Sequence, residues 1–164
     1  MKKYELTEET KVIGGKTLFR IRALRSFGDI KAGDLGGFIE NERNLSHEGN
    51  AWVSGDARVD GDARVDGDAW VDGDAWVDGN AQVSGDGLIN SNNDYLCEKG
   101  LGSHNRSASF FKCKDGHIHV LCGCFDGNLD EFENKVKKEH GNSKYAKEYL
   151  GFIEVVKTHF EVCQ

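Results

Sequence analysis

The sequence lacks a long apolar run. The absence matters most at its first residues, where a signal peptide would lie. Met1, Lys2 and Lys3 are followed by the polar stretch Tyr-Glu-Leu-Thr-Glu-Glu. This start matches neither a secretory signal peptide nor a membrane-spanning segment. We therefore expect no membrane association and a cytoplasmic location.

The sequence also lacks the even set of cysteines that a disulfide framework requires. An odd number of cysteines in a chain without an export signal favours reduced thiols. The 164 residues are enough for a real core but few for two large domains, so we expect one compact body with appended elements. The five cysteines are Cys97, Cys113, Cys122, Cys124 and Cys163.

Basic residues are scarce in residues 53–86, which carry 2 Lys/Arg against 9 Asp/Glu. The net charge of this stretch is −7, which equals the net charge of the whole chain. The remaining residues are therefore neutral in sum, and the acidity of the protein is concentrated in one region. A region with such an excess of negative charge favours partners that are positively charged.

A strict six-residue repeat occupies the same stretch. From Val53 the chain reads VSGDAR, VDGDAR, VDGDAW, VDGDAW, VDGNAQ and VSGDGL. The recurring valine and alanine are predicted to point inward, and the recurring glycine gives the backbone freedom that a corner needs. Three six-residue sides make a triangular coil of eighteen residues, which stacks on the next coil by parallel strand pairing.

The repeat resembles the hexapeptide signature of left-handed parallel β-helix proteins. Both have an aliphatic residue, then a small or acidic one, two free positions and a small residue. The resemblance implies a mainly β fold with a short left-handed β-helix of about three coils, from Leu35 to Leu88. Extending the register backwards from Val53 predicts inward positions at Leu35, Ile39, Asn41, Leu45 and His47.

Other short-period folds match the repeat less well. Calcium-binding β-rolls repeat in nines with paired glycines, whereas the period here is six, so the aspartates are not arranged as that ion site requires. Ice-binding helices need flat threonine arrays, which this sequence lacks.

The eighteen-residue period also predicts which outward side chains stack on one another. Trp52, Trp70 and Leu88 are expected in one ladder, with Arg58 and Trp76 in a second and Arg64 and Gln82 in a third. The first ladder is an apolar stripe, which either a cap or the C-terminal segment covers, or a partner or another copy of the chain contacts. A homo-oligomer, a dimer or trimer, is compatible with the resembled family.

The residues before the repeat are predicted to form a cap. Residues 11–25 read as a β-hairpin that turns at Gly14-Gly15, with Phe19, Ile21 and Ala23 on its apolar face. An open β-helix end exposes unpaired backbone groups and an apolar cross-section, so a cap is physically required.

The residues after the repeat are predicted to form a separate α+β module. Residues 107–113 and 117–121 flank a Lys-Asp-Gly turn and read as a hairpin, and two helices should follow from about Asn128. The expected organisation is a hairpin cap over 1–34, the β-helix over 35–90, a linker over 91–106 and the α+β module over 107–164.

Three motifs together resemble uncharacterised phage and prophage proteins. They are a Gly-Asp-Leu-Gly-Gly segment at 33–37, the Gly-Asp-Ala hexapeptides, and Cys-Gly-Cys-Phe-Asp-Gly-Asn-Leu-Asp-Glu-Phe at 122–132. The resemblance implies a viral or prophage origin, and hence the cytoplasm of a bacterial host. It supplies no catalytic residues.

An acyltransferase is the enzymatic alternative, because many left-handed β-helix proteins transfer acyl groups with a histidine as general base. His47 is the only histidine within the coils and is a weak candidate, because its position is predicted to point inward. Such enzymes also carry a loop that projects from the helix, and the repeat contains no insertion. We expect no catalytic residue.

A zinc site is a further alternative, for which the weak candidates are Cys113, His117, His119, Cys122 and Cys124. Cys-x-Cys is not the usual ligand spacing, and alternate strand residues share a face for packing reasons alone. Buried thiols are the favoured interpretation, and we expect neither a metal nor another cofactor.

A binding function is the interpretation that we favour. Aspartates recur on stacked coils about 4.8 Å apart, so they present negative charge in rows, as a nucleic acid does. The chain is expected to act as a non-enzymatic interaction protein that inhibits a host nuclease or defence complex, without binding nucleic acid through this surface. The expected partner-binding residues are Asp60, Asp62, Asp66, Asp68, Asp72, Asp74, Asp78, Trp52, Trp70 and Trp76.

The repeat is also compatible with two roles that need no host partner. The aspartates suit corners and keep a solenoid soluble whether or not they bind another protein. A structural or assembly role in the virion is the remaining alternative, which finding the protein in purified particles would support.

Overall fold

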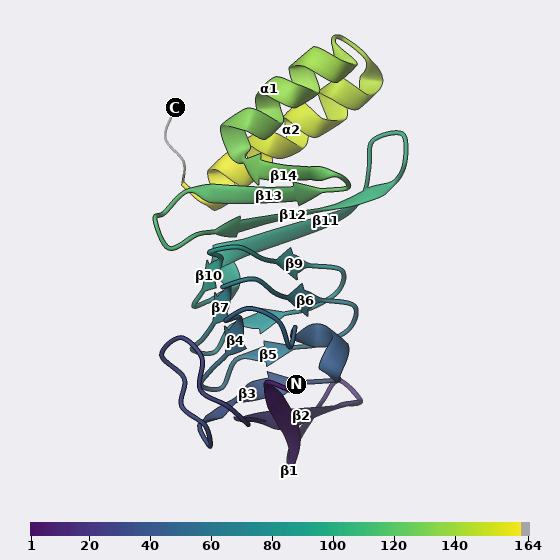
Figure 1. The fold of residues 1–164 in the computed structure, drawn as a ribbon. Helices are drawn as coiled ribbons and strands as arrows, with labels where there is room; N and C mark the ends of the chain where they lie inside the picture. The colour runs from purple at the N-terminus through teal and green to yellow at the C-terminus, as the bar shows by residue number, and fades with distance from the viewer. Residues whose placement is uncertain (162–164) are drawn as a thin grey trace. The chain divides into compact units, whose positions relative to one another are not determined.

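The computed structural model describes residues 1–161, so Cys163 lies outside the described residues. The fold is mainly β, with two α-helices and several sheets (Figure 1). The chain divides into two compact units, Met1–Asn92 and Asn93–Gln164, which are called unit 1 and unit 2. Across the described part of the chain, no helix is long and apolar enough to span a membrane.

Unit 1 begins with three longer strands and continues with seven strands of two residues each. The longer strands are β1 (Tyr4–Ile13), β2 (Lys16–Ala23) and β3 (Leu35–Ile39). The short strands are β4 (Trp52–Val53), β5 (Arg58–Val59), β6 (Arg64–Val65), β7 (Trp70–Val71), β8 (Trp76–Val77), β9 (Gln82–Val83) and β10 (Leu88–Ile89).

The short strands pair in parallel with strands eighteen residues away. Trp52 pairs with Trp70, and Trp70 pairs with Leu88. Arg58 pairs with Trp76 and Arg64 with Gln82 in two further stacks. All three predicted ladders are therefore confirmed, because each pair falls one eighteen-residue coil apart.

The valines and alanines of the repeat form the core between the three stacks. From Ala51 to Val83 every one of them is at most 1% exposed, as predicted. Burying a branched aliphatic side chain contributes about 1.5–3 kcal/mol, so the repeated valines are the main apolar contribution of each coil.

The first coil departs from the predicted register. Ile39 pairs with Val59, and Leu45 forms an isolated bridge with Val65, so these pairs are twenty residues apart. Leu45 and Val53 are eight residues apart instead of the six of the repeat, so two extra residues lie between them. Ile39 and Leu45 take the valine positions and are buried.

Three of the predicted inward positions are wrong as a result. Leu35 is 54% exposed, whereas Asn41 and His47 are partly exposed. Asn41 instead caps the short 3-10 helix η1 (Glu42–Asn44). The two extra residues shift the register, so positions counted back from Val53 no longer face the core.

The N-terminal hairpin extends one stack of the coils. The strand order is β1-β2-β3-β5-β8, in which β2 is antiparallel to β3 and the later pairs are parallel. A register shift between Arg20 and Arg22 places Leu18 in the core with Ile21, while Phe19 is only partly buried. A bulge of this kind changes which residues face inward, so the predicted alternation holds only after it.

Buried polar side chains satisfy the backbone at the open edge of the first coil. Lys3 is 0% exposed, and its Nζ donates to the carbonyl oxygen of Ala51 at 2.7 Å. The hydroxyl of Tyr4 donates to the carbonyl of Leu45 at 2.7 Å. Asn44 Nδ2 donates to the carbonyl of Ala63 at 2.9 Å. The carbonyls of Leu45 and Ala51 have no coil below them, whereas the Ala63 carbonyl faces η1 of the first coil where a strand would otherwise pair with it. Leaving any of these carbonyls unpaired would cost about 1–3 kcal/mol.

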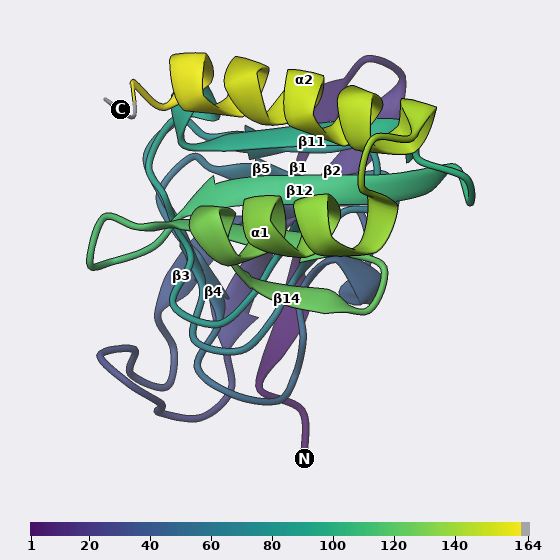
Figure 2. The same ribbon diagram turned by 90° about the horizontal axis from the view of Figure 1, so that it is seen from above.

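Unit 2 is an antiparallel sheet covered on one face by two helices (Figure 2). Its elements are η2 (Asn92–Asp94), which begins at the unit boundary, β11 (Tyr95–Leu101), β12 (Arg106–Lys112), β13 (Ile118–Cys122), β14 (Phe125–Asn128), α1 (Leu129–His140) and α2 (Lys144–His159). The sheet order is β11-β12-β13-β14, and Phe110, Val120, Phe132, Ile153 and Val156 lie in the core between sheet and helices.

In unit 2, the structure differs from the predicted linker but confirms the predicted start of the first helix. Residues 95–101 form β11, although 91–106 was predicted to be a linker, because this segment pairs with β12 from Tyr95 to Leu101. The predicted capping box is confirmed: Asn128 accepts from the Glu131 backbone N–H, and the Glu131 carboxylate accepts from the Asn128 N–H.

Replacing Lys3 by methionine is expected to change how the stability of unit 1 depends on pH. Burial lowers the pKa of Lys3 from its ordinary 10.5 to about 8 in the folded chain. Between these values the unfolded chain binds more protons, so this residue makes the free energy of unfolding rise with pH across that window. The Lys3→Met variant should lack this rise.

All three tryptophans lie in unit 1, so urea unfolding followed by tryptophan fluorescence reports on that unit. The measurement compares the wild type, Lys3→Met and the exposed control Lys99→Met at pH values from 8 to 10.5. An identical pH dependence in the wild type and Lys3→Met would contradict the assignment of Lys3 as a buried, pH-sensitive cap.

Candidate functional site

The acidic residues of the coils in unit 1 are spread over three corners. The first corner follows β4 and β7, the second follows β5 and β8, and the third follows β6 and β9. Of the aspartates predicted to bind a partner, Asp62, Asp66, Asp68, Asp74 and Asp78 are exposed, Asp72 is partly exposed and Asp60 is buried.

The third corner comprises residues 46–51, 66–69 and 84–87. It contains four carboxylates and no lysine or arginine, and the four are exposed. Neighbouring coils at this corner are held by backbone hydrogen bonds, such as Asp68 N–H to Gly85 O at 2.9 Å. The carboxylates of the third corner belong to Glu48, Asp66, Asp68 and Asp86.

Lysines of the N-terminal hairpin contact the other two corners. Lys11 Nζ lies 2.6 Å from Asp56 at the first corner, and Lys16 Nζ lies 2.6 Å from Asp60 at the second. The Asp60 carboxylate raises the pKa of Lys16, and the Lys11 ammonium lowers the pKa of Asp56. The hairpin therefore offsets part of the charge at these two corners.

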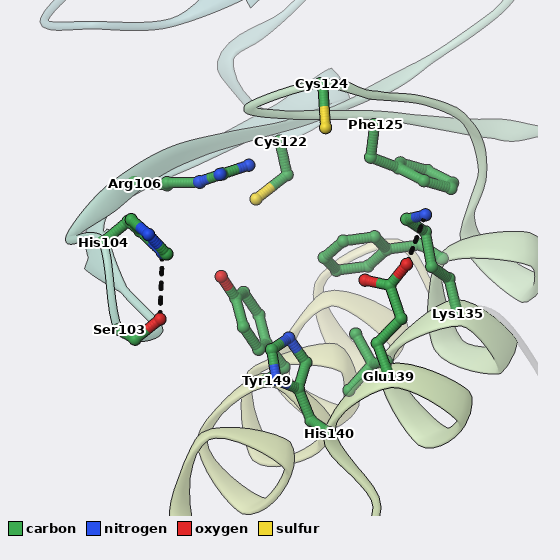
Figure 3. A pocket seen from close by; sticks show the side chains of 12 residues that line it. Ser103, His104, Arg106, Cys122, Cys124, Phe125, Lys135, Glu139, His140 and Tyr149 are labelled. Carbon is green, nitrogen blue, oxygen red and sulfur yellow. Dashed lines mark hydrogen bonds and ion pairs between the residues drawn. The ribbon is translucent and has the colours of Figure 1, made fainter.

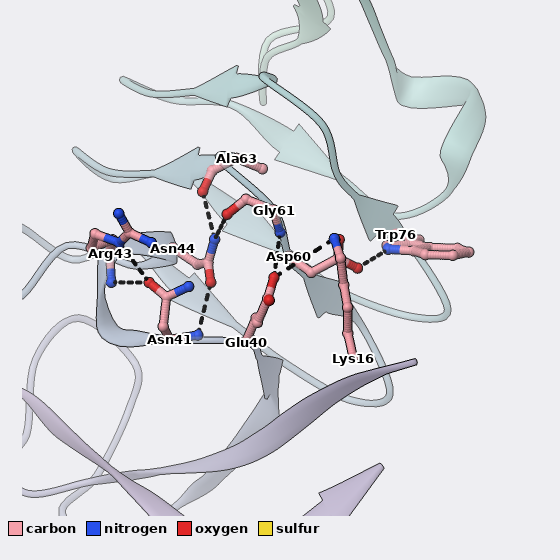
Figure 4. A network of polar contacts seen from close by, with 9 residues as sticks. All are labelled: Lys16, Glu40, Asn41, Arg43, Asn44, Asp60, Gly61, Ala63 and Trp76. Carbon is pink, nitrogen blue, oxygen red and sulfur yellow. Dashed lines mark hydrogen bonds and ion pairs between the residues drawn. The ribbon is translucent and has the colours of Figure 1, made fainter. Parts of the chain in front are cut away.

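Asp60 belongs to a polar network rather than to the surface (Figure 4). It is 2% exposed, and its Oδ2 accepts from Trp76 Nε1 at 2.6 Å. Lys16 contacts its other oxygen, and Glu40 accepts from the Gly61 N–H at 2.7 Å in the same network. Both carboxylate oxygens of Asp60 are thus engaged inside the chain, so Asp60 differs from the exposed aspartates of the predicted partner-binding set, and its contact with a partner stays a prediction.

The predicted tryptophan surface is only partly present. Trp52 is 1% exposed and packs edge-on against Phe27 with ring centroids 5.4 Å apart. Trp70 and Trp76 are partly exposed, and Trp76 lies 5.2 Å from the Arg58 guanidinium. Trp52 is thus buried under the cap, in line with the alternative that a cap covers this ladder, and its contact with a partner stays a prediction.

His47 lies against the cap and not on an open surface. Its ring stacks on Tyr4 with centroids 4.3 Å apart, and its Nδ1 accepts from the Lys3 backbone N–H at 3.2 Å. Nε2 lies 3.7 Å from the Glu42 carboxylate. A general base needs a nitrogen that can reach the substrate proton, and these contacts give His47 a packing role.

The five predicted metal candidates fall into two separate groups in unit 2. Cys113, His117 and His119 come together at the turn between β12 and β13, with one ligand atom of each within 4.8 Å of the others. Cys122 and Cys124 instead line a pocket on the helical side. The two-residue period of a strand was the signal that could have separated the groups, because His119 and Cys122 are three residues apart and face opposite sides of β13.

That pocket has a volume of about 240 Å³ and lies beside α1 and α2 (Figure 3). Phe125, Phe132 and Tyr149 form its aromatic wall, and Arg106 and Lys135 add positive charge. The Lys135 ammonium lies 2.7 Å from the Glu139 carboxylate. The aromatic and cationic lining was not predicted, because its residues come from distant parts of the sequence.

The thiols of this pocket are not arranged for nucleophilic chemistry. Burial raises the pKa of the Cys122 thiol, so the thiolate is disfavoured at neutral pH. Burial, together with the nearby Cys122, also raises the pKa of Tyr149 to about 12. The His140 ring stacks on Tyr149, with centroids 5.6 Å apart. These contacts supply no base that activates Cys122.

Substituting Asp60 should cost stability, whereas substituting Asp62 should not. Asp60→Ala removes the acceptor of the Trp76 indole N–H and the partner of Lys16, for which we expect a loss of about 1–3 kcal/mol. Asp62→Ala changes an exposed side chain and should stay within about 0.5 kcal/mol of the wild type. Urea unfolding followed by tryptophan fluorescence measures both, and equal losses would contradict this division of the aspartates.

No protein-family model matches the chain. Among curated proteins, the chain is similar to the uncharacterized acetyltransferase YdcK of Escherichia coli strain K12, with 39% identity over 61 residues. The match covers 32% of this chain and 19% of the relative, so the chain spans about a fifth of the length of the curated relative that it matches. The similarity is therefore local, and it links part of this chain to an acetyltransferase.

Proposed function

We propose that this protein is a non-enzymatic interaction protein of phage or prophage origin that binds a basic, nucleic-acid-handling protein of its bacterial host. Its carboxylates take the place of nucleic-acid phosphates and inhibit the host protein. The binding surface is the third corner of unit 1, with Glu48, Asp66, Asp68 and Asp86.

The observation that supports this proposal is that the three corners differ in their basic residues and in their ion pairs with the hairpin. Lys11 and Lys16 of the hairpin form ion pairs with carboxylates of the first and second corners. The third corner contains four exposed carboxylates and no lysine or arginine in its own segments, and the buried Lys3 donates to backbone carbonyls there. Neighbouring coils repeat about every 4.8 Å, so the carboxylates stand on a rigid, regular support. Fixed rows of one charge attract a partner with the opposite charge and speed its association.

We also propose that the coils wind as a left-handed parallel β-helix. The eighteen-residue period, the three stacks of two-residue strands and the hexapeptide pattern support this winding. Short strands joined by four-residue corners leave no room for the helices that usually connect parallel strands. A β-helix suits display, because its outward side chains repeat while its core stays constant.

The test is affinity capture from a bacterial host lysate with the tagged full-length chain. The wild type should retain a basic protein that binds nucleic acid, and added duplex DNA should displace that protein. Raising the salt concentration should weaken the capture, because exposed charges are screened. A variant with Glu48→Gln, Asp66→Asn, Asp68→Asn and Asp86→Asn should lose about tenfold or more of the affinity.

The matched control carries the same change of charge on unit 2, with Glu98, Glu139, Glu148 and Glu154 replaced by glutamine, all of them exposed. It should retain the partner. The proposal fails if the corner variant still captures the protein, or if capture is indifferent to salt and DNA.

An acyltransferase is the second candidate, because the relative with 39% identity over 61 residues is named an acetyltransferase. The contacts of His47 with Tyr4 and Lys3 argue against a role as general base. We therefore expect no turnover of acyl-coenzyme A by the purified chain. Turnover that is lost in His47→Ala but kept in the control His104→Ala would favour the transferase instead.

A further inference from the structure

The turn between β12 and β13 gathers three side chains that can bind a metal ion. The Cys113 N–H donates to the His117 carbonyl at 3.0 Å, so these residues face one another across a tight turn with Gly116 at φ 88°. His119 lies two residues further along the chain, on the same side as His117. His117 Nε2 and His119 Nδ1 are 3.4 Å apart.

In each histidine, the ring nitrogen that faces away from the other histidine contacts a carboxylate. Asp115 Oδ1 lies 2.5 Å from His117 Nδ1, and Asp126 Oδ1 lies 2.7 Å from His119 Nε2. An ionised carboxylate only accepts hydrogen bonds, so these two ring nitrogens carry the hydrogens. In the neutral rings, the facing nitrogens Nε2 of His117 and Nδ1 of His119 then carry lone pairs.

Two lone pairs cannot form a hydrogen bond with each other, so in this tautomer a metal ion or a shared proton between the facing nitrogens would satisfy both. The edge of a tetrahedron with Zn–N bonds of about 2.0–2.1 Å is about 3.3–3.4 Å long. The two nitrogens already have this separation. The Cys113 sulfur and one ring nitrogen of each histidine lie within 4.8 Å of one another, which brings the thiol close enough to be a third ligand.

We propose that Cys113, His117 and His119 bind one divalent zinc-type cation, with Asp115 and Asp126 orienting the two imidazoles. Carboxylates that accept from the distal nitrogen of a histidine ligand are a recurring feature of zinc sites. A shared proton would also satisfy the facing nitrogens, but it would not involve the nearby thiol. One sulfur and two nitrogens select zinc or cobalt over magnesium or calcium.

Binding would convert the Cys113 thiol to a thiolate and release its proton to solvent. The three protein ligands leave a fourth coordination position for water or an external ligand. The ion would fix residues 114–116 of the turn to β13. This site lies in unit 2 and is independent of the acidic corner, so it adds a second property to the protein.

The experiment titrates the reduced, metal-free full-length chain with Co²⁺ and follows its absorption. One equivalent should produce the thiolate-to-cobalt charge-transfer band and the visible bands of tetrahedral cobalt, and Zn²⁺ should abolish both. Long-range proton–nitrogen spectra of the histidine rings should then show Zn²⁺ shifting Nε2 of His117 and Nδ1 of His119. This second readout needs no variant and is therefore insensitive to misfolding.

Variants separate the ligands from the other thiols. Cys113→Ser should remove the charge-transfer band, and Asp126→Asn should weaken zinc binding about 10–100-fold by releasing His119. Cys122→Ser, Cys124→Ser and Cys163→Ser should leave one equivalent bound. The proposal is overturned if no charge-transfer band forms, if the band survives in Cys113→Ser, or if the ring spectra report a protonated histidine pair unaffected by Zn²⁺.

Discussion

Backbone hydrogen bonds between neighbouring coils are the interaction on which unit 1 depends. Trp52 N–H donates to Ala69 O at 3.0 Å, and Trp70 N–H donates to Gly87 O at 2.8 Å, one coil further on. Because a change of one residue in this register would turn every side chain to the other face, the pairing decides which residues form the core and which face solvent. The buried valines, the three ladders and the positions of the carboxylates all follow from this pairing.

A stack of this kind has an open end, and the structure closes it with polar side chains as well as with a strand. The hairpin pairs with β3, while Lys3 and Tyr4 donate to carbonyls that have no coil below them. The same hairpin carries Lys11 and Lys16, which contact carboxylates of two corners. The same hairpin therefore both closes the end of the stack and pairs with carboxylates at two of its corners.

The regular part of the fold was predictable because one repeat specifies it. The spacing of valine and alanine was sufficient to predict the core and the three ladders. The first coil was mispredicted because counting back from Val53 assumes an unbroken period. Ile39 and Leu45 stand six residues apart, as the valines do, but Leu45 and Val53 stand eight apart, and this spacing was the available signal.

The sites were less predictable than the fold, because they depend on contacts between residues that are distant in the sequence. Asp60 resembles the other aspartates of the repeat, and only its contacts with Lys16 and Trp76 set it apart. In unit 2, five possible metal ligands were grouped by residue type, whereas the structure separates Cys113, His117 and His119 from Cys122 and Cys124, as the alternation along β13 could have indicated. The role of Asp126 was not predictable from spacing, because it approaches His119 only through the pairing of β13 with β14.

The eighteen-residue register is the central claim, and scalar couplings across hydrogen bonds in solution NMR test it most directly. We predict a coupling between the amide nitrogen of Trp52 and the carbonyl carbon of Ala69, and a second between Trp70 and Gly87. Couplings from these amides to carbonyls in any other register would contradict the account, because the core, the ladders and the acidic corner would then be composed of different residues.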